Sequence, residues 1–147
     1  MARSRNYRDL IAWQKAMKLA RAAYQLSNQL PRKEAFGLVT QLQRAAVSVP
    51  SNIAESHGRL TDLQFRHFLG NARGSLYELQ TQVELACDLG SIQSEELRGF
   101  MEQGQEVARL INGLITALRE VHGTNAPTPL TARSAANSAN TTIKRPH

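Results

Sequence analysis

Apolar residues recur at alternating spacings of three and four along most of the chain, which is the pattern of one face of an α-helix. The clearest run covers three heptads: Phe65, Leu69, Ala72, Leu76, Leu79, Val83 and Ala86. A later run has the same spacing: Leu97, Met101, Gly104, Ala108, Ile111, Ile115 and Leu118. A shorter run lies near the N-terminus: Leu10, Trp13, Met17, Ala20 and Tyr24. The three runs predict three amphipathic helices.

A fourth run keeps its spacing across Pro50: Leu38, Leu42, Ala45, Val49 and Ile53. A proline inside a helix removes one backbone hydrogen bond and crowds the carbonyl four residues earlier, at a cost of about 3 kcal/mol or more. Because the apolar pattern does not shift, we predict a helix kinked at Pro50 rather than a loop. Ser48 and Ser51 are expected to bond carbonyls near the kink.

Turn and capping residues separate these runs. Gly58 is expected to stop the second helix in a left-handed conformation, and Gly90 to end the third. Thr61 followed by Gln64 reads as a capping box at the start of the third helix. The predicted helices span about residues 7–30, 33–57, 62–89 and 95–121.

None of these helices is stable alone, since an amphipathic helix depends on packing its apolar face. Short connections make consecutive helices antiparallel neighbours, so we predict an all-α, up-down-up-down four-helix bundle as one domain, residues 1–121. Residues 122–147 lose the periodicity and are rich in Ala, Asn, Ser and Thr. We expect them to form a flexible basic tail, either an unselected end or a nucleic-acid-binding arm.

A polar stripe adjoins the apolar face around Pro50: Arg44, Ser48, Asn52 and Glu55. Such a stripe is commonly a solvated face, but short polar side chains also make specific hydrogen bonds at structural contacts and interfaces. Glu55 would form an ion pair with Arg66 or Arg73, within the bundle or across a subunit boundary.

Composition narrows the class of protein. With 41% apolar but only 5% aromatic residues, the chain can bury a mostly aliphatic core. Neither an apolar segment at the N-terminus nor a run of about 18 apolar residues occurs, so we expect a soluble cytoplasmic protein.

The formal net charge of +6 is unevenly distributed. Residues 1–75 hold 12 Lys or Arg and 4 Asp or Glu, whereas residues 76–120 hold 3 and 8. This asymmetry indicates either an anionic partner for the basic half or pairing between basic and acidic surfaces.

Patterns for catalysis and metal binding are lacking in the sequence. The single Cys87 leaves no pair for a disulfide or a cysteine zinc site. Glu55 and His57 lie two residues apart and face different ways, unlike the Glu-x-x-His pairs of di-metal bundles. Gly70 and Gly74 lie inside a predicted helix, where they indicate close approach of another helix. We expect no enzymatic activity, cofactor or metal.

Seven basic residues are candidates for nucleic-acid binding: Lys15, Lys18, Arg21, Arg44, Arg59, Arg66 and Arg73. Contacts of such residues with phosphates hold nucleic acid without reading its sequence. Tyr7 and Trp13 are the only aromatic residues near the cations of the first helix, and we expect Trp13 to be buried. The alternative is a protein-interaction scaffold with no direct nucleic-acid binding, whose basic residues pair with neighbouring subunits or an acidic partner.

Three segments carry a family resemblance: LIAWQKAMKLARAAY at 10–24, RAAVSVPSNIAES at 44–56 and FLGNARGSLYELQTQ at 68–82. They resemble the four-helix-bundle family encoded in intervening sequences of 23S ribosomal RNA genes, which is related to the accessory variability determinant of diversity-generating retroelements. The resemblance implies a cytoplasmic homopentameric ring. For retroelement relatives it also implies a basic surface and partnership with a reverse transcriptase and nucleic acid.

Two positions depart from the family's pattern. Gln43 stands where the family often has a second arginine beside Arg44, and Gln80 stands where it often has glutamate, so each departure removes a charge. The uneven charge still suits a ring, in which one surface of each copy meets a different surface of the next. The basic residues of the first two helices would then face the acidic residues of the last two.

Overall fold

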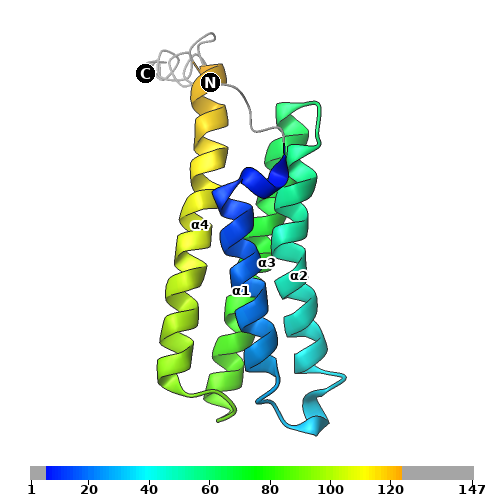
Figure 1. The fold of residues 1–147 in the computed structure, drawn as a ribbon, viewed down its shortest axis with the longest axis vertical. Coiled ribbons are helices and arrows are strands. Elements are labelled where there is room, and N and C mark those ends of the chain that lie inside the picture. Colours follow the sequence, from blue (N-terminus) through cyan, green and yellow to red (C-terminus); the bar gives the residue numbers. More distant parts are fainter. Residues whose placement is uncertain (1–5, 124–147) are drawn as a thin grey trace, which may run out of the picture. The chain divides into compact units, whose positions relative to one another are not determined.

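The computed structural model describes residues 6–123, with the side chains of residues 6–118, and over that range it contains four α-helices and no strand (Figure 1). The helices are α1 (Ile11–Ser27), α2 (Leu38–His57), α3 (Asp62–Asp88) and α4 (Ser94–Gly123). Two short 3-10 helices, Tyr7–Asp9 and Arg32–Glu34, precede α1 and α2. The prediction of an all-α protein with four helices is confirmed.

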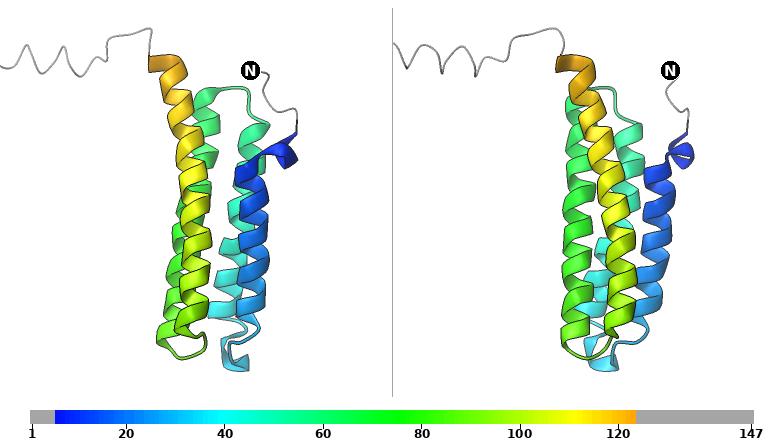
Figure 2. Two further views of the ribbon diagram at one scale, coloured as in Figure 1. Left: turned by 60° about the vertical axis from the view of Figure 1, so that its left-hand side comes forward. Right: turned by 90° about the vertical axis from the view of Figure 1, so that its left-hand side faces the viewer.

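The helices lie side by side as a four-helix bundle (Figures 1 and 2). The first compact unit ends at Thr116 and holds α1, α2, α3 and most of α4. A second unit begins at Ala117, and its described residues, 117–123, are helical. Residues 124–147, most of the predicted tail, lie outside the described residues.

The core follows the predicted apolar runs closely in α2 and α3. In α3 every residue of the run from Leu69 to Ala86 is fully buried, and Phe65 packs against the core. The run of α2 is also buried beyond its first residue: Leu42, Ala45, Val49 and Ile53. In α4 the buried face includes Phe100 and Val107, which flank the predicted run and are larger than its glycine and alanine. Burial of these aliphatic faces supplies the main driving force for folding.

The predicted apolar run of α1 is not its most buried face. That face lies beside it: Ala12, Ala16, Leu19, Ala23 and Leu26. Trp13, expected to be buried, is only half-buried, and Tyr24 is 42% exposed. The distance between packed helices depends on the side chains at their contact. The small alanines therefore let α1 approach its neighbours closely, and the larger residues of the run stay at the edge of the core.

The first two helices begin later than predicted. Residues 7–9 form a separate 3-10 turn, and the extended Leu10 divides that turn from α1. The stretch expected to open the second helix at residue 33 is another 3-10 turn, and α2 begins only at Leu38. Gly37, directly before α2, has φ −112° and ψ −106°, a backbone conformation outside the helical region.

The ends around α3 are set by local hydrogen bonds. Thr61 Oγ1 accepts from the backbone N–H of Gln64 at 3.3 Å, as its capping role predicts. Gly90 has φ +86°, and backbone hydrogen bonds from Gly90 and Ser91 to carbonyls in the last turn of α3 close that turn. The corresponding prediction for Gly58 is wrong, because its φ is −82°.

Pro50 lies inside α2, which is helical on both sides of it. The prediction that the chain remains helical across this proline is confirmed. Pro50 is buried and lines a surface groove together with residues of α1, so the ring contributes apolar contact that offsets part of its backbone cost.

Candidate functional site

An apolar groove runs along the surface where α1 and α2 meet, with a volume of about 680 Å³. Its walls include three large residues of α1 and three residues of α2: Trp13, Met17, Tyr24, Val47, Pro50 and Ala54. Tyr7 also lines the groove and packs edge-on against Trp13, with 5.3 Å between the ring centroids. We call this the α1–α2 groove.

The α1–α2 groove is bordered by positive charge. Arg21 is the only charged residue among the described residues that line it, and it is exposed. Arg44 lies one helical turn before Val47 on the same face of α2 and is also exposed. Val47 itself is 48% exposed, so a broad apolar surface stays open to water within the described chain. Contiguous apolar surface of this kind marks a site of interaction.

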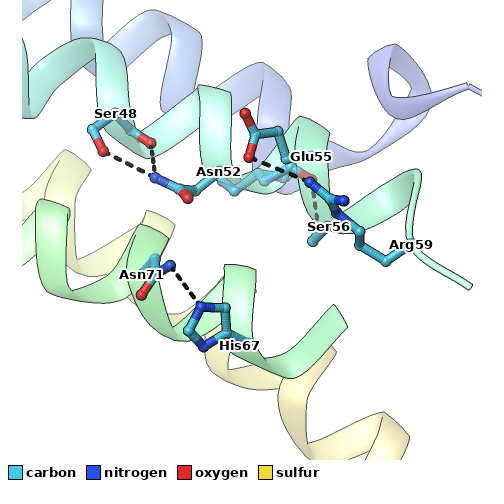
Figure 3. Close-up of polar contacts among 8 residues, drawn as sticks. Ser48, Asn52, Glu55, Ser56, Arg59, His67 and Asn71 are labelled. Atoms are coloured by element: carbon cyan, nitrogen blue, oxygen red, sulfur yellow. Dashed lines mark hydrogen bonds and ion pairs between the residues drawn. The ribbon is translucent and has the colours of Figure 1, made fainter. Parts of the chain in front are cut away.

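The middle of the polar stripe faces α3 and not solvent. The Asn52 side-chain amide donates to the carbonyl and the hydroxyl of Ser48, at 2.8 and 2.9 Å (Figure 3). The Ser48 and Ser75 hydroxyls are 2.8 Å apart, and Ser75 lies on α3. Because Ser48 Oγ already accepts from Asn52, its own proton is free to be donated to Ser75. Ser48 thus links α2 to α3. The expected hydrogen bond from its hydroxyl to a backbone carbonyl is not formed among the described residues.

Glu55 does not pair with Arg66 or Arg73. Its carboxylate lies 3.8 Å from the guanidinium of Arg59, four residues on in the same segment (Figure 3). Arg73 instead donates to the Asn112 side-chain oxygen at 3.0 Å, which joins α3 to α4. Arg59 lies two residues beyond the end of α2, so its long side chain is close enough in sequence to reach back to Glu55 in the last turn.

The seven candidate cations fall into two groups. Three are engaged within the chain: Lys15 lies 3.4 Å from Glu106 on α4, Arg73 is held by Asn112, and Arg59 pairs with Glu55. Arg59 also stacks over the Phe68 ring at 4.1 Å. The other four are exposed and form no ion pair with another described residue: Lys18, Arg21, Arg44 and Arg66. We call these the four exposed cations.

The close approach expected at Gly70 and Gly74 is not found within the chain. A methyl group added at either position would meet no atom of another described element within 4 Å. The close approach occurs instead at Gly104 of α4, where an added methyl would overlap the Gln80 side chain of α3. A glycine inside a helix costs about 1 kcal/mol relative to alanine, so Gly70 and Gly74 have a cost that contacts within the described chain do not explain.

The two glutamines that depart from the family pattern both fill structural positions. Gln80 occupies the space beside Gly104, between α3 and α4. Gln43 donates from its side-chain amide to the Ser27 hydroxyl at 3.1 Å, which joins α2 to α1. Each neutral side chain therefore links two helices of the bundle.

Residues 6–123 contain neither a metal-binding cluster nor a membrane-spanning helix. No group of three or more His, Cys, Asp or Glu is placed there to hold a metal ion. None of the helices in that range combines the length and the apolar character needed to cross a bilayer.

Sequence reasoning missed the α1–α2 groove. The signal was present in part, because the apolar run of the first helix contained Trp13 and Tyr24, and both line the groove. The same helix also has a second apolar face, formed mainly by small alanines. Because one apolar face is enough to pack against the bundle, the face with the large residues remained available for another contact.

The fold and its surface define a helical-bundle protein with an open apolar groove and exposed cations. The family model described as 23S rRNA-intervening sequence protein matches residues 8–113, and the chain belongs to this family. The resemblance read from residues 10–82 is thereby confirmed for that family.

A solved structure from Bacteroides thetaiotaomicron has a similar fold. It is described as a protein with unknown function from the S23 ribosomal protein family. The TM-score is 0.66 at 21% sequence identity, and the match covers 71% of this chain and 98% of that chain. At that identity the similarity concerns the fold. No curated protein matches the chain.

Proposed function

We propose that the protein is a non-enzymatic, oligomeric scaffold whose basic surface binds nucleic acid, with RNA as the first ligand to test. The observation that supports this most directly is the exposure of Lys18, Arg21, Arg44 and Arg66 without ion pairs to other described residues.

The charge of α1 makes this helix suited to a polyanion. Its three charged residues are Lys15, Lys18 and Arg21, and it contains no Asp or Glu. Cations that lack a partner bind phosphates without first breaking an ion pair, and binding releases counterions from the nucleic acid. Contacts of this kind hold the backbone and do not read the bases.

A gel-shift titration tests the proposal, with single-stranded and duplex RNA and DNA of about 30 nucleotides at about 50 and 200 mM salt. We expect a shift at the lower salt concentration that weakens strongly at the higher one. Absence of a shift for every probe at the lower concentration would refute nucleic-acid binding.

The scaffold is proposed to be a closed ring of identical copies, and the family resemblance implies five. A ring repeats the four exposed cations around one axis and so multiplies weak phosphate contacts. The uneven charge of the chain supports a contact between two different surfaces, which is the kind that closes into rings. Native mass spectrometry at micromolar concentration should show the pentamer, and a monomer there would contradict the ring.

Two finer features of each copy also belong to the proposal. Consecutive helices are expected to be antiparallel, because the connections between them are short. The axis of α2 is expected to bend at Pro50, since this residue has no N–H for the Ala46 carbonyl and its ring crowds that carbonyl. A crystal structure of the assembly tests both features.

A more specific form of the proposal makes the protein a cytoplasmic accessory partner of a retroelement reverse transcriptase. It is supported by the resemblance of residues 44–56 and 68–82, which belong to α2 and α3, to the intervening-sequence family, because that family is related to the accessory variability determinant. A reverse-transcriptase gene beside this gene, whose product copurifies with the protein, is the expected observation. A neighbourhood without such a gene contradicts this form and leaves RNA binding unaffected.

The second candidate function is a protein-interaction scaffold with no direct nucleic-acid binding. The α1–α2 groove favours it, because the walls are mainly apolar and Arg21 is the only charge in them. It also agrees with the engagement of Lys15, Arg59 and Arg73 within the chain. A failed gel shift together with a stable assembly is the result expected for this candidate.

A further inference from the structure

Two open apolar surfaces of the chain lie on different helices. One is the α1–α2 groove. The other follows α3 at spacings of 4, 3, 4 and 4 residues: Gly70, Gly74, Tyr77, Thr81 and Leu85. Residues with these spacings share one face of a helix. We call this second surface the α3 outer stripe.

The α3 outer stripe has the form of a surface that another backbone approaches. Tyr77 is 49% exposed and Leu85 is 47% exposed, although both are large apolar residues inside a helix. Gly70 and Gly74 leave open space on the same face, and no described element of the chain uses it. Small residues permit close approach of a second backbone, and exposed apolar side chains beside them give that contact its driving force.

The charges next to the groove are basic, whereas those next to the C-terminal half of the α3 outer stripe are acidic; the basic Arg66 lies at the other end, one turn before Gly70. Lys18 and Arg21 of α1 and Arg44 of α2 lie around the groove. On α3, Glu84 follows Thr81 by one helical turn, and the half-helix from Leu76 to Asp88 contains three acidic and no basic residues. Complementary charge of this kind orients two surfaces as they meet.

We propose that the α3 outer stripe of one copy packs into the α1–α2 groove of the next copy. This inference rests on the oligomer of the proposed function and assigns its contact surfaces. A second copy fits the groove better than a nucleic-acid strand, because the groove walls are mainly apolar. The contact joins two different surfaces, so an open chain of copies leaves one groove free at one end and one stripe free at the other until a ring closes.

Two single substitutions test the two surfaces separately. Gly74→Leu fills the open space on the stripe with a residue that favours helix, and Val47→Glu places a charge in the groove at a side chain that is already half-exposed. Gly113→Leu is the matched control, because Gly113 of α4 has equally open surroundings on another helix. Native mass spectrometry and size-exclusion chromatography measure assembly, and circular dichroism checks that each variant is folded.

We expect Gly74→Leu and Val47→Glu each to weaken self-association at least about tenfold, which is roughly 1.4 kcal/mol per contact. Gly113→Leu should assemble like the unchanged chain. Trp13 is the only tryptophan and lines the groove, so its emission reports occupancy. It should shift to shorter wavelength as the unchanged chain assembles and should not shift in the two weakened variants.

Mixing the two weakened variants gives the sharpest result. The Gly74→Leu chain keeps an intact groove and the Val47→Glu chain keeps an intact stripe, so one good contact is available between them. The mixture should form a dimer with one copy of each, while each variant alone stays monomeric. A contact of groove with groove cannot give this rescue.

The possible failures are distinguishable. If the unchanged chain is a monomer, the oligomer of the proposed function is wrong and this inference falls with it. If the assembly forms and survives both Gly74→Leu and Val47→Glu, the oligomer stands and the assignment of surfaces is wrong. If RNA quenches Trp13 while Gly74→Leu leaves assembly intact, the groove is a nucleic-acid site and the inference is overturned.

Discussion

Asn52 positions Ser48 for the hydrogen bond that joins α2 to α3. Its amide makes two hydrogen bonds to Ser48 and orients the Ser48 hydroxyl toward Ser75. A half-buried network of this kind rigidifies the contact when every member is satisfied. The two central residues of the polar stripe, Ser48 and Asn52, therefore have a structural role.

Replacing Asn52 with alanine should lower the free energy of unfolding by about 1 to 2 kcal/mol, because it removes two hydrogen bonds and leaves the Ser48 hydroxyl without its donor. Urea denaturation followed by circular dichroism measures this change. The matched control is Asn71→Ala, since Asn71 is exposed and only contacts the His67 ring at 3.4 Å (Figure 3). Equal losses in the two variants would show that the Ser48–Asn52–Ser75 network has no special role.

Single residues were predicted unevenly from the sequence. Ser48 and Asn52 stood out as short polar residues beside an apolar face. Their partner Ser75 did not, because the sequence pattern of one helix does not show which face the neighbouring helix turns toward it. The pairing of Glu55 was assigned to distant arginines, whereas the nearer Arg59 forms it. Glu55 pairs with the arginine nearest to it in the sequence, which the charges alone did not predict.

Helix boundaries depend on a few backbone conformations, and Gly90 is the clearest case. It is the only described residue with positive φ, at +86°, and it ends α3. A side chain with a β-carbon is strained in that region. Gly113 of α4 lies inside a helix instead, and a methyl group added there would meet no described atom within 4 Å beyond its own helix.

Gly90→Ala should destabilise the protein by about 1 kcal/mol, since alanine must adopt the left-handed conformation that glycine takes without strain. Gly113→Ala should stabilise it by up to about 1 kcal/mol, because alanine favours the helix interior. Thermal unfolding of both variants checks the opposite signs. A stabilising Gly90→Ala would mean that the turn after α3 is not held in the left-handed region.

Element positions followed from the sequence where one apolar face dominated. The runs of α2 and α3 matched their buried faces because those helices have a single stripe of large aliphatic residues. α1 has two apolar faces. The face with the alanines is the buried one, because small side chains allow closer packing of the helices. The periodicity shows that a helix has an apolar face, but the choice between two such faces depends on the neighbours.

At the scale of the whole molecule, the number of helices and the class of fold were predictable from the four apolar runs and the turns between them. The groove and the α3 outer stripe were not, because each depends on which face the bundle leaves uncovered. The charge asymmetry was visible in the sequence, yet only the structure separates Lys15, Arg59 and Arg73, which are engaged, from the four exposed cations.

Replacing the four exposed cations with glutamine should weaken RNA binding far more than an equal change of charge elsewhere. The matched control replaces four other exposed cations with glutamine, at Arg32, Lys33, Arg98 and Arg109. Both variants lose the same net charge, so a general field effect would weaken them equally. A specific loss in the first variant assigns the phosphate contacts to Lys18, Arg21, Arg44 and Arg66.

The salt dependence of RNA affinity tests the central proposal most directly, because the slope of log K against log salt counts the phosphates that the protein neutralises. For the unchanged assembly and a single-stranded RNA of about 30 nucleotides, we predict a slope steeper than about −3, at roughly −0.7 per phosphate contact. The variant lacking the four exposed cations should give a clearly shallower slope, and the control variant should not. A slope near zero, or equal slopes for all three proteins, would contradict the account.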